Sequence, residues 1–257
     1  MAANNLDGTL AVPLESNPEV MNDWAEKAGL VISQDRFYDV LGFDDEVHLL
    51  LDLVPKPVKA VILLYPGLDD VVPKMEEEDA RIAKEGQHPI DETVVWIKQT
   101  IRHWCGTMAI LHALINSNVT IAPESPLAKF TEICKGKTGL ERAKLLEENP
   151  TFATIHNTSA NAGQSTVPTG ADLLDVIGHF TCFVQAPSPP TREEEIEAPE
   201  GAMRIVELNG GRIGPLDRGV TTDFLKDVAR FVREGYMKQT TNLGFTMIAL
   251  AATGSDS

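Results

Sequence analysis

Short apolar runs alternate with amphipathic stretches along this chain, and the mixture predicts an α/β fold. Residues 60–65 are apolar at almost every position, which predicts a strand that is buried on both faces. Strand composition also marks residues 37–40, 176–185, 203–208 and 245–250. Helical spacing or composition marks residues 17–29, 76–86, 105–115, 126–135, 140–148 and 222–238.

Capping residues indicate where several of these helices begin or end. Asn17-Pro18-Glu19 supplies an N-cap residue, a first-turn proline and an acidic first turn, and Gly29 supplies the stop. The segment 76–86 is acidic and ends at its own glycine, so we expect a solvent-exposed helix there. The helix over residues 222–238 has one apolar face, which is formed by Phe224, Leu225, Val228, Phe231 and Val232.

No internal repeat and no linker divides the chain, so residues 1–257 are predicted to form a single domain. Residues 1–11 have the composition of a disordered tail. Asn, Ser, Gly, Thr and Pro predominate over residues 157–175, and an irregular connection of that length inside a domain is usually functional. Residues 186–202 are rich in Pro and Glu and are predicted to be an exposed insert.

The amino-acid composition indicates the cellular compartment in which the protein is expected. The 257 residues, 43% of them hydrophobic, are enough for one large core. No stretch approaches the roughly 20 apolar residues that span a bilayer, and the first residues lack a secretory signal pattern. The three cysteines cannot all pair, which favours a reducing compartment over a disulfide scaffold or a thiolate zinc site. We therefore expect a cytoplasmic protein without a membrane partner, and leave the nucleus open as a second location.

The net charge indicates which classes of binding partner are expected. The formal net charge of −16 repels phosphate backbones, so we expect no nucleic-acid partner and consider a basic protein the better candidate. The alternative is that this charge serves solubility alone. Gly136-Lys137-Thr138 ends like a phosphate-binding loop, but Thr131 stands where the first glycine of that motif belongs. Neither a cofactor nor a metal is therefore expected.

A cysteine followed by glycine opens the apolar helix that is predicted from residue 105. A thiolate at a helix N-terminus is stabilised by the helix dipole and by unpaired N–H groups, which lower its pKa from about 8.5. Gly106 would allow a substrate carbonyl to approach, and the Gln99 side-chain amide could join the Cys105 N–H as a second oxyanion donor. The alternative is that Cys105 is an ordinary buried residue.

A nucleophilic thiol needs an imidazole to accept its proton, and the imidazole needs a group that orients it. His179 has the best context among the six histidines, because it lies in a run of strand residues directly after a long loop. His103 is two residues from Cys105, so the two side chains are expected to point in different directions. Asn209, at the end of the next predicted strand, can accept a ring N–H; the alternative is that Asn209-Gly210 is only a turn.

With these residues in place, the sequence resembles the ubiquitin C-terminal hydrolase family. The resemblance is carried in order along the chain by residues 12–20, 53–66, 99–107, 157–164, 178–180 and 207–212. It implies a papain-like cysteine peptidase with helices packed around a mainly antiparallel six-stranded sheet and a knotted chain. It also implies that residues 157–175 cross over the active site and limit the size of the leaving group.

By matching position, the resemblance makes Cys105 the nucleophile, His179 the base, Asn209 the orienting residue and Gln99 the oxyanion donor. It implies substrate contacts at Pro13, Leu14, Ser159, Ala160 and Gly163. Two positions depart from the family pattern: Asn209 stands where aspartate is usual, with an additional glycine after it, and His103 stands where asparagine is usual.

The implied function is the thiol-dependent release of ubiquitin, or of a related modifier, from small C-terminal adducts, peptides or precursor extensions. The expected partner is ubiquitin, whose basic face would suit the acidic chain, and the protein is expected to be a monomer. The rival interpretation, which rests on the departures at Asn209 and His103, is a ubiquitin-binding protein with weak or no turnover.

Overall fold

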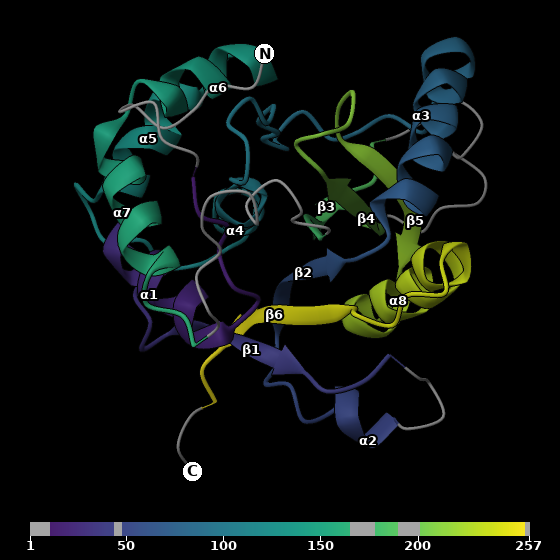
Figure 1. The fold of residues 1–257 in the computed structure, drawn as a ribbon, viewed down its shortest axis with the longest axis horizontal. Helices are drawn as coiled ribbons and strands as arrows, with labels where there is room; N and C mark the ends of the chain where they lie inside the picture. Colours follow the sequence, from purple (N-terminus) through teal and green to yellow (C-terminus); the bar gives the residue numbers. More distant parts are fainter. Residues whose placement is uncertain (1–10, 44–47, 165–177, 190–200, 255–257) are drawn as a thin grey trace.

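A six-stranded sheet lies at the centre of the protein, and its neighbouring strands run antiparallel in the order β1-β6-β2-β3-β4-β5 (Figure 1). The computed structural model describes residues 11–43, 48–164, 178–189 and 201–254. The strands are β1 (Asp35–Val40), β2 (Val58–Tyr65), β3 (His179–Pro187), β4 (Met203–Leu208), β5 (Leu216–Thr221) and β6 (Thr246–Ala252).

Helices cover both faces of the sheet (Figure 1). The helices on one face are α1 (Pro18–Ala28), α4 (Cys105–Ile115), α5 (Pro126–Cys134), α6 (Gly139–Glu147) and α7 (Pro150–Ala160). The helices on the other are α2 (His48–Leu51), α3 (Leu68–Glu85) and α8 (Phe224–Phe231), the last followed by a π-helical turn (Val232–Tyr236) and a 3-10 turn (Met237–Gln239). The predicted fold class, helices around a mainly antiparallel six-stranded sheet, is confirmed; the knotted path remains an expectation.

The strand β2 shows why its sequence is apolar at nearly every position. Ala60 and Ile62 point into the hydrophobic core beneath α4, whereas Val61 and Leu63 point into the core beneath α8. Successive side chains of a strand face opposite sides of the sheet, so helices on both sides require apolar residues at consecutive positions. The prediction for residues 60–65 is thereby confirmed.

Helix α4 is the innermost helix, and it packs against β2 and β3. Every residue from Cys105 to Leu114 is buried. A helix that is apolar all round belongs in the interior of a protein, and this position fixes the start of α4 against the sheet. Among the described residues, no helix is both long enough and apolar enough to cross a bilayer.

Local capping signals position the flanking helices as expected. The Asn17 side chain accepts a hydrogen bond from the Glu19 backbone N–H, and Gly29 ends α1 at φ 124°. Thr138 and Glu141 form a reciprocal capping box at the start of α6. The helices predicted from residues 105, 126 and 140 begin within one residue of those positions.

Some boundaries differ from the prediction. Residues 157–160, predicted as loop, are the last turn of α7, a helix that the polar composition of this segment concealed. The Thr158 hydroxyl donates to the Thr154 carbonyl, and the Ser159 hydroxyl donates to Asp23 of α1, so these polar side chains are satisfied within helical structure. The remainder of the predicted loop from residue 165 to 175 lies outside the described residues.

Two other predicted irregular segments are corrected at their edges. Ala186 and Pro187, assigned to the insert 186–202, continue β3, and Ala186 is buried against the core. Ala11, the last residue of the predicted tail, is also buried. The rest of the predicted tail (1–10) and the insert from 190 to 200 lie outside the described residues. Helix α3 begins at Leu68, eight residues before its prediction, and α2 and β5 had no counterpart in the sequence analysis.

Candidate active site

Three strand ends and the first turn of α4 meet at one place. Tyr65 is the last residue of β2 and pairs in register with His179, the first residue of β3. Asn209 directly follows β4, the other neighbour of β3. Because antiparallel neighbours place the end of one strand beside the start of the next, these three side chains lie together. Cys105, the first residue of α4, completes the group.

The imidazole of His179 bridges the thiol and the amide. His179 Nε2 lies 3.0 Å from Asn209 Oδ1, and the His179 side chain also hydrogen-bonds Cys105. An amide oxygen only accepts hydrogen bonds, so Nε2 carries the ring proton in the neutral form. That leaves Nδ1 as the ring nitrogen able to take the thiol proton.

The pairing of Cys105 with His179 reverses the effect that burial alone would have on the pKa of each side chain. Burial by itself would raise the pKa of the Cys105 thiol, but the hydrogen bond and charge of His179, with the Phe180 and Gly106 N–H groups, lower that pKa. Burial would likewise lower the pKa of His179, but the hydrogen bond and charge of Cys105, and then Asn209, raise it. Together the two shifts favour a thiolate–imidazolium pair.

The comparisons with known proteins agree with this arrangement. A family model described as ubiquitin carboxyl-terminal hydrolase, family 1, matches residues 11–238. This chain belongs to that family. As a family member it is a cysteine-type ubiquitin hydrolase, as the resemblance implied.

Relatives from plants and animals cover most of the chain. Ubiquitin carboxyl-terminal hydrolase 3 of Arabidopsis thaliana is 33% identical, over 93% of this chain and 93% of its own. The ubiquitin carboxyl-terminal hydrolase of Drosophila melanogaster is 31% identical, over 93% of this chain and 96% of its own. A Trichinella spiralis UCH37 catalytic domain, solved with ubiquitin vinyl methyl ester, superposes with a TM-score of 0.66, 17% identity and 98% coverage of both chains.

Gln99 lies against the turn that carries Asn209. Its backbone N–H donates to the Gly210 carbonyl at 2.9 Å, and a side chain at Gly210 would clash with the Gln99 backbone and Cβ. A glycine is therefore required at 210 for this close approach. The Gln99 side-chain Nε2 donates to the Ile101 carbonyl at 3.2 Å, which uses one of its two hydrogens.

The predicted substrate-contact residues divide into two sets. Leu14, Ser159 and Ala160 are buried, and Leu14 packs against Gly106 in the hydrophobic core. These three side chains therefore face the interior of the protein. Pro13 and Gly163 are partly exposed, so a substrate contact remains a prediction for these two residues. At Gly106, the absence of a side chain also makes room for Leu14 and Phe180.

Tyr65 is a site residue that the sequence analysis missed. Its hydroxyl accepts a hydrogen bond from Asn209 Nδ2 at 3.3 Å, and its ring lies edge-on to the His179 ring. Burial, together with the charge of Glu207, raises the pKa of Tyr65, so the hydroxyl stays protonated. The only signal in the sequence was a tyrosine at the end of an otherwise aliphatic strand.

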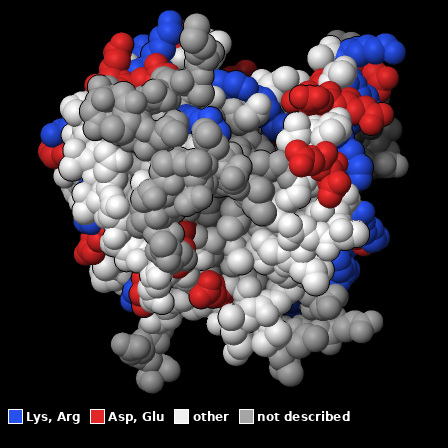
Figure 2. Space-filling model, viewed as in Figure 1, with Lys and Arg blue, Asp and Glu red and all other residues white. Residues whose placement is uncertain are grey.

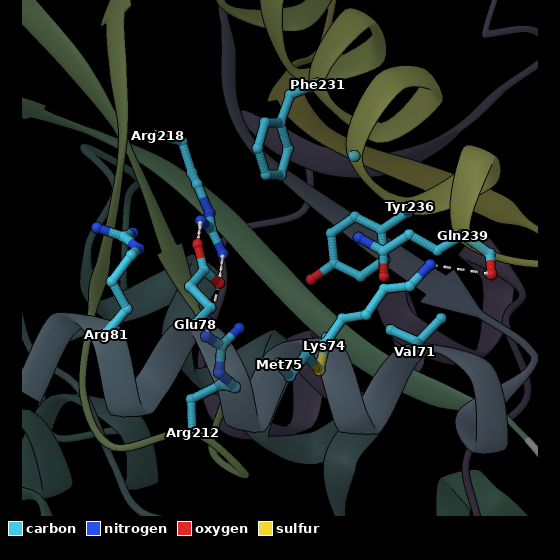
Figure 3. Close-up of a pocket in the computed structure, with 11 residues that line it drawn as sticks. Val71, Lys74, Met75, Glu78, Arg81, Arg212, Arg218, Phe231, Tyr236 and Gln239 are labelled. Carbon is cyan, nitrogen blue, oxygen red and sulfur yellow. Dashed lines mark hydrogen bonds and ion pairs between the residues drawn. The ribbon is translucent and has the colours of Figure 1, made fainter.

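A buried ion network supports the strand β4 behind Asn209. The Glu207 carboxylate is fully buried and accepts hydrogen bonds from Thr181, Tyr236 and Arg218. Figure 3 shows Arg218 and Arg212 approaching the same Glu78 carboxylate from opposite sides. Although burial opposes ionisation, these two arginines hold the pKa of Glu78 at about 2. The charges in this network are paired with one another.

Two further histidines, His103 and His156, lie outside the hydrogen-bonded series of Cys105, His179 and Asn209. The His103 backbone has φ 63°, and burial with the charge of Arg102 lowers the pKa of its side chain. His156 is fully buried, bonds the Thr107 hydroxyl and the Val12 carbonyl, and has its pKa lowered to about 4 by burial. His156 therefore has a packing role in the interior. The described residues contain no cluster of three or more side chains suited to a metal ion.

Proposed function

We propose that Cys105, His179, Asn209 and Gln99 hydrolyse the bond between the C-terminal glycine of ubiquitin and a small amine, peptide or precursor extension. The observation that carries this proposal is the hydrogen-bonded series from Cys105 through His179 to Asn209, with the pKa of the thiol lowered and that of the imidazole raised. A pair with these opposite shifts is chemically suited to attack a carbonyl at neutral pH.

The acylation step begins when the Cys105 thiolate attacks the carbonyl carbon and forms a C–S bond. Negative charge develops on the carbonyl oxygen, where the Cys105 N–H and the second Gln99 amide hydrogen would stabilise it. The C–N bond then breaks, and the His179 imidazolium gives its proton to the departing amine. The product is a thioester between Cys105 and ubiquitin.

The deacylation step reverses these roles. Neutral His179 takes a proton from water, and the resulting hydroxide attacks the thioester carbonyl. Collapse of the second oxyanion breaks the C–S bond and releases the C-terminal carboxylic acid of ubiquitin, which gives its proton to solvent. The thiolate–imidazolium pair is thereby restored. Asn209 fixes the ring tautomer throughout.

Recognition of ubiquitin is supported by a cleft of about 640 Å³ between the segment before α1 and strand β1. Its lining includes the carboxylates of Glu15, Glu19 and Asp39 and one basic side chain, Arg36, so the lining is acidic on balance. Gly163 lies next to Glu15. Carboxylates of this kind suit a basic partner surface. On the face drawn in Figure 2, acidic and basic side chains are mixed around α3, so the net charge of −16 does not form one continuous acidic surface there.

A ubiquitin probe with a C-terminal electrophile tests the proposal. We expect covalent addition of one probe to Cys105, located by peptide mass spectrometry, and no addition to the Cys105→Ser variant. Cys134→Ala is the matched control and should be labelled like the parent, because burial raises the pKa of Cys134 to about 11. A parent protein that binds ubiquitin without being labelled would instead support a ubiquitin-binding role with weak or no turnover.

The size limit on the leaving group is a second part of the proposal, and it rests on the implied crossover of residues 157–175. Hydrolysis of ubiquitin linked to a small fluorophore should exceed that of ubiquitin fused to a folded domain. Equal rates on the two substrates would contradict the size limit without affecting the assignment of Cys105.

A further inference from the structure

The side-chain amide of Asn209 forms hydrogen bonds through both its oxygen and its nitrogen. Its oxygen accepts from His179 Nε2 at 3.0 Å and from the Gly211 backbone N–H at 2.9 Å. Its nitrogen donates to the Tyr65 hydroxyl at 3.3 Å. Asn209 is only 2% exposed, so solvent water cannot replace a hydrogen-bond partner that is removed.

The orientation of this amide decides which nitrogen of His179 carries the proton. If the amide were rotated by half a turn, its NH₂ group would face both His179 Nε2 and the Gly211 N–H. Nε2 would then have to act as an acceptor, and the ring proton would move to Nδ1, the nitrogen that faces the thiol. In that tautomer the ring cannot take the proton of Cys105. A carboxylate has two equivalent oxygens and no wrong orientation.

The hydroxyl of Tyr65 is arranged to be an acceptor. It donates its own hydrogen to Met75 Sδ at 3.6 Å, which leaves an oxygen lone pair for the Asn209 amide. The ring is held in place by an edge contact with His179 at 5.6 Å and a tilted contact with Tyr236 at 4.9 Å. The strand register places Tyr65 directly opposite His179, so hydroxyl, amide and imidazole are held on one framework.

We propose that Tyr65 is a positioning residue that holds the Asn209 amide with its oxygen toward His179. An asparagine at 209 must be oriented to set the tautomer, and Tyr65 binds its nitrogen while the Gly211 N–H binds its oxygen. The inference rests on the proposed function of Cys105 and His179, and it assigns Tyr65 no contact with substrate.

A double-mutant cycle with Tyr65→Phe and Asn209→Asp tests this role. Tyr65→Phe keeps the ring and removes only the hydroxyl, and we expect kcat/KM on a ubiquitin amide to fall roughly fivefold, the effect of one hydrogen bond of ordinary strength. The loss should lie in kcat, and the alkaline limb of the pH profile should move to lower pH. In the Asn209→Asp background the same change should cost less than about twofold, because a carboxylate needs no orienting. Equal losses in the two backgrounds would overturn the proposal.

Tyr236→Phe is the matched control. It removes another buried tyrosine hydroxyl from the same aromatic group, but that hydroxyl bonds Glu207 and does not touch Asn209. Thermal unfolding should show destabilisation by both variants, while only Tyr65→Phe should move the alkaline limb. A shift of the same size in Tyr236→Phe would mean that Tyr65 acts through packing alone.

Alkylation of Cys105 by iodoacetamide gives a readout that does not depend on ubiquitin. Tyr65→Phe should move the pH midpoint of alkylation upward by on the order of half a unit, because a poorly oriented imidazole stabilises the thiolate less. If the parent failed to hydrolyse ubiquitin amides, the proposed function would be wrong, yet this midpoint would still test Tyr65. An unchanged midpoint in Tyr65→Phe would show that Tyr65 does not position Asn209.

Discussion

Cysteines and histidines are buried both in the interior of this protein and at the strand ends of the candidate active site, and their pKa values are shifted in opposite directions at the two places. In the interior, burial raises the pKa of Cys182 far above its ordinary value, and burial lowers the pKa of His156 to about 4. At the strand ends, Cys105 is also buried, but its pKa is lowered, and the pKa of its partner His179 is raised. Pairing with an imidazole, and not burial, therefore separates a thiol whose pKa is lowered from one whose pKa is raised.

The difference depends on where the side chains stand in the fold. Cys182 lies in the middle of β3, only three residues from His179, but the strand pairs it with Leu208 and Ile62. Cys105 stands 74 positions before His179 in the numbering, at the start of a helix that the fold brings against the end of β3. Distance along the chain says little about which thiol meets which imidazole.

Removing the thiol should have the largest effect. Cys105→Ser replaces a thiolate by a hydroxyl that stays protonated, so we expect kcat/KM on a ubiquitin amide to fall by about 10⁴-fold or more. Binding of ubiquitin, measured by calorimetry, should remain within a few fold, because the substitution removes chemistry and little surface. Substantial turnover by the serine variant would exclude Cys105 as the nucleophile.

Removing the imidazole should make Cys105 resemble Cys182. His179→Ala deletes the largest of the interactions that lower the thiol pKa, and it leaves burial, which raises that pKa, opposed only by the Phe180 and Gly106 N–H groups. The thiolate then forms only at higher pH, so the iodoacetamide rate at pH 7 should drop by about 30-fold or more. The measurement is a pH profile of alkylation for parent and variant. A thiolate midpoint at the parent's pH in His179→Ala would show that another group activates the thiol.

Changing the orienting residue should have an intermediate effect. Asn209→Ala should reduce kcat/KM about tenfold, or about 1.4 kcal/mol in barrier. Asn209→Asp should keep or raise the activity, because a carboxylate adds charge that stabilises the imidazolium. A further rise in the pKa of His179 would extend activity to higher pH, so the alkaline limb of kcat/KM should move upward. If Asn209→Ala matched the parent across this profile, Asn209 would be only a turn residue.

Deleting the inert thiol should have the smallest effect on catalysis. Cys182→Ala leaves a small cavity in the core, with an expected loss of about 1–2 kcal/mol in the free energy of unfolding. Activity of the folded variant should stay within about twofold of the parent, and Cys134→Ala should behave similarly. Denaturant unfolding and a rate assay on the same samples separate the two effects. A large loss of turnover in Cys182→Ala, without unfolding, would contradict its inert role.

The sequence alone determined most of what depends on neighbouring residues. Asn17, Pro18 and Gly29 predicted both ends of α1, and the apolar run at 60–65 predicted a strand that is buried on both faces. Cys105 at the start of an apolar helix was also visible locally, and so was His179 in a run of strand residues after a long loop. These signals act within one turn or one strand, where capping and side-chain periodicity are direct consequences of backbone geometry.

Only the tertiary structure decided how distant segments share one site. The contact between Asn209 and Tyr65 joins residues 144 positions apart, and no local pattern marks a strand-end tyrosine as the acceptor for that amide. Leu14 looked like a substrate contact and is instead packed against Gly106. Segment 157–160 looked irregular but is the last turn of α7, where the Ser159 hydroxyl has a partner on α1. In each case the partner that satisfies a polar group or covers an apolar one comes from another element, and pairing between elements follows from packing and strand register rather than from local sequence.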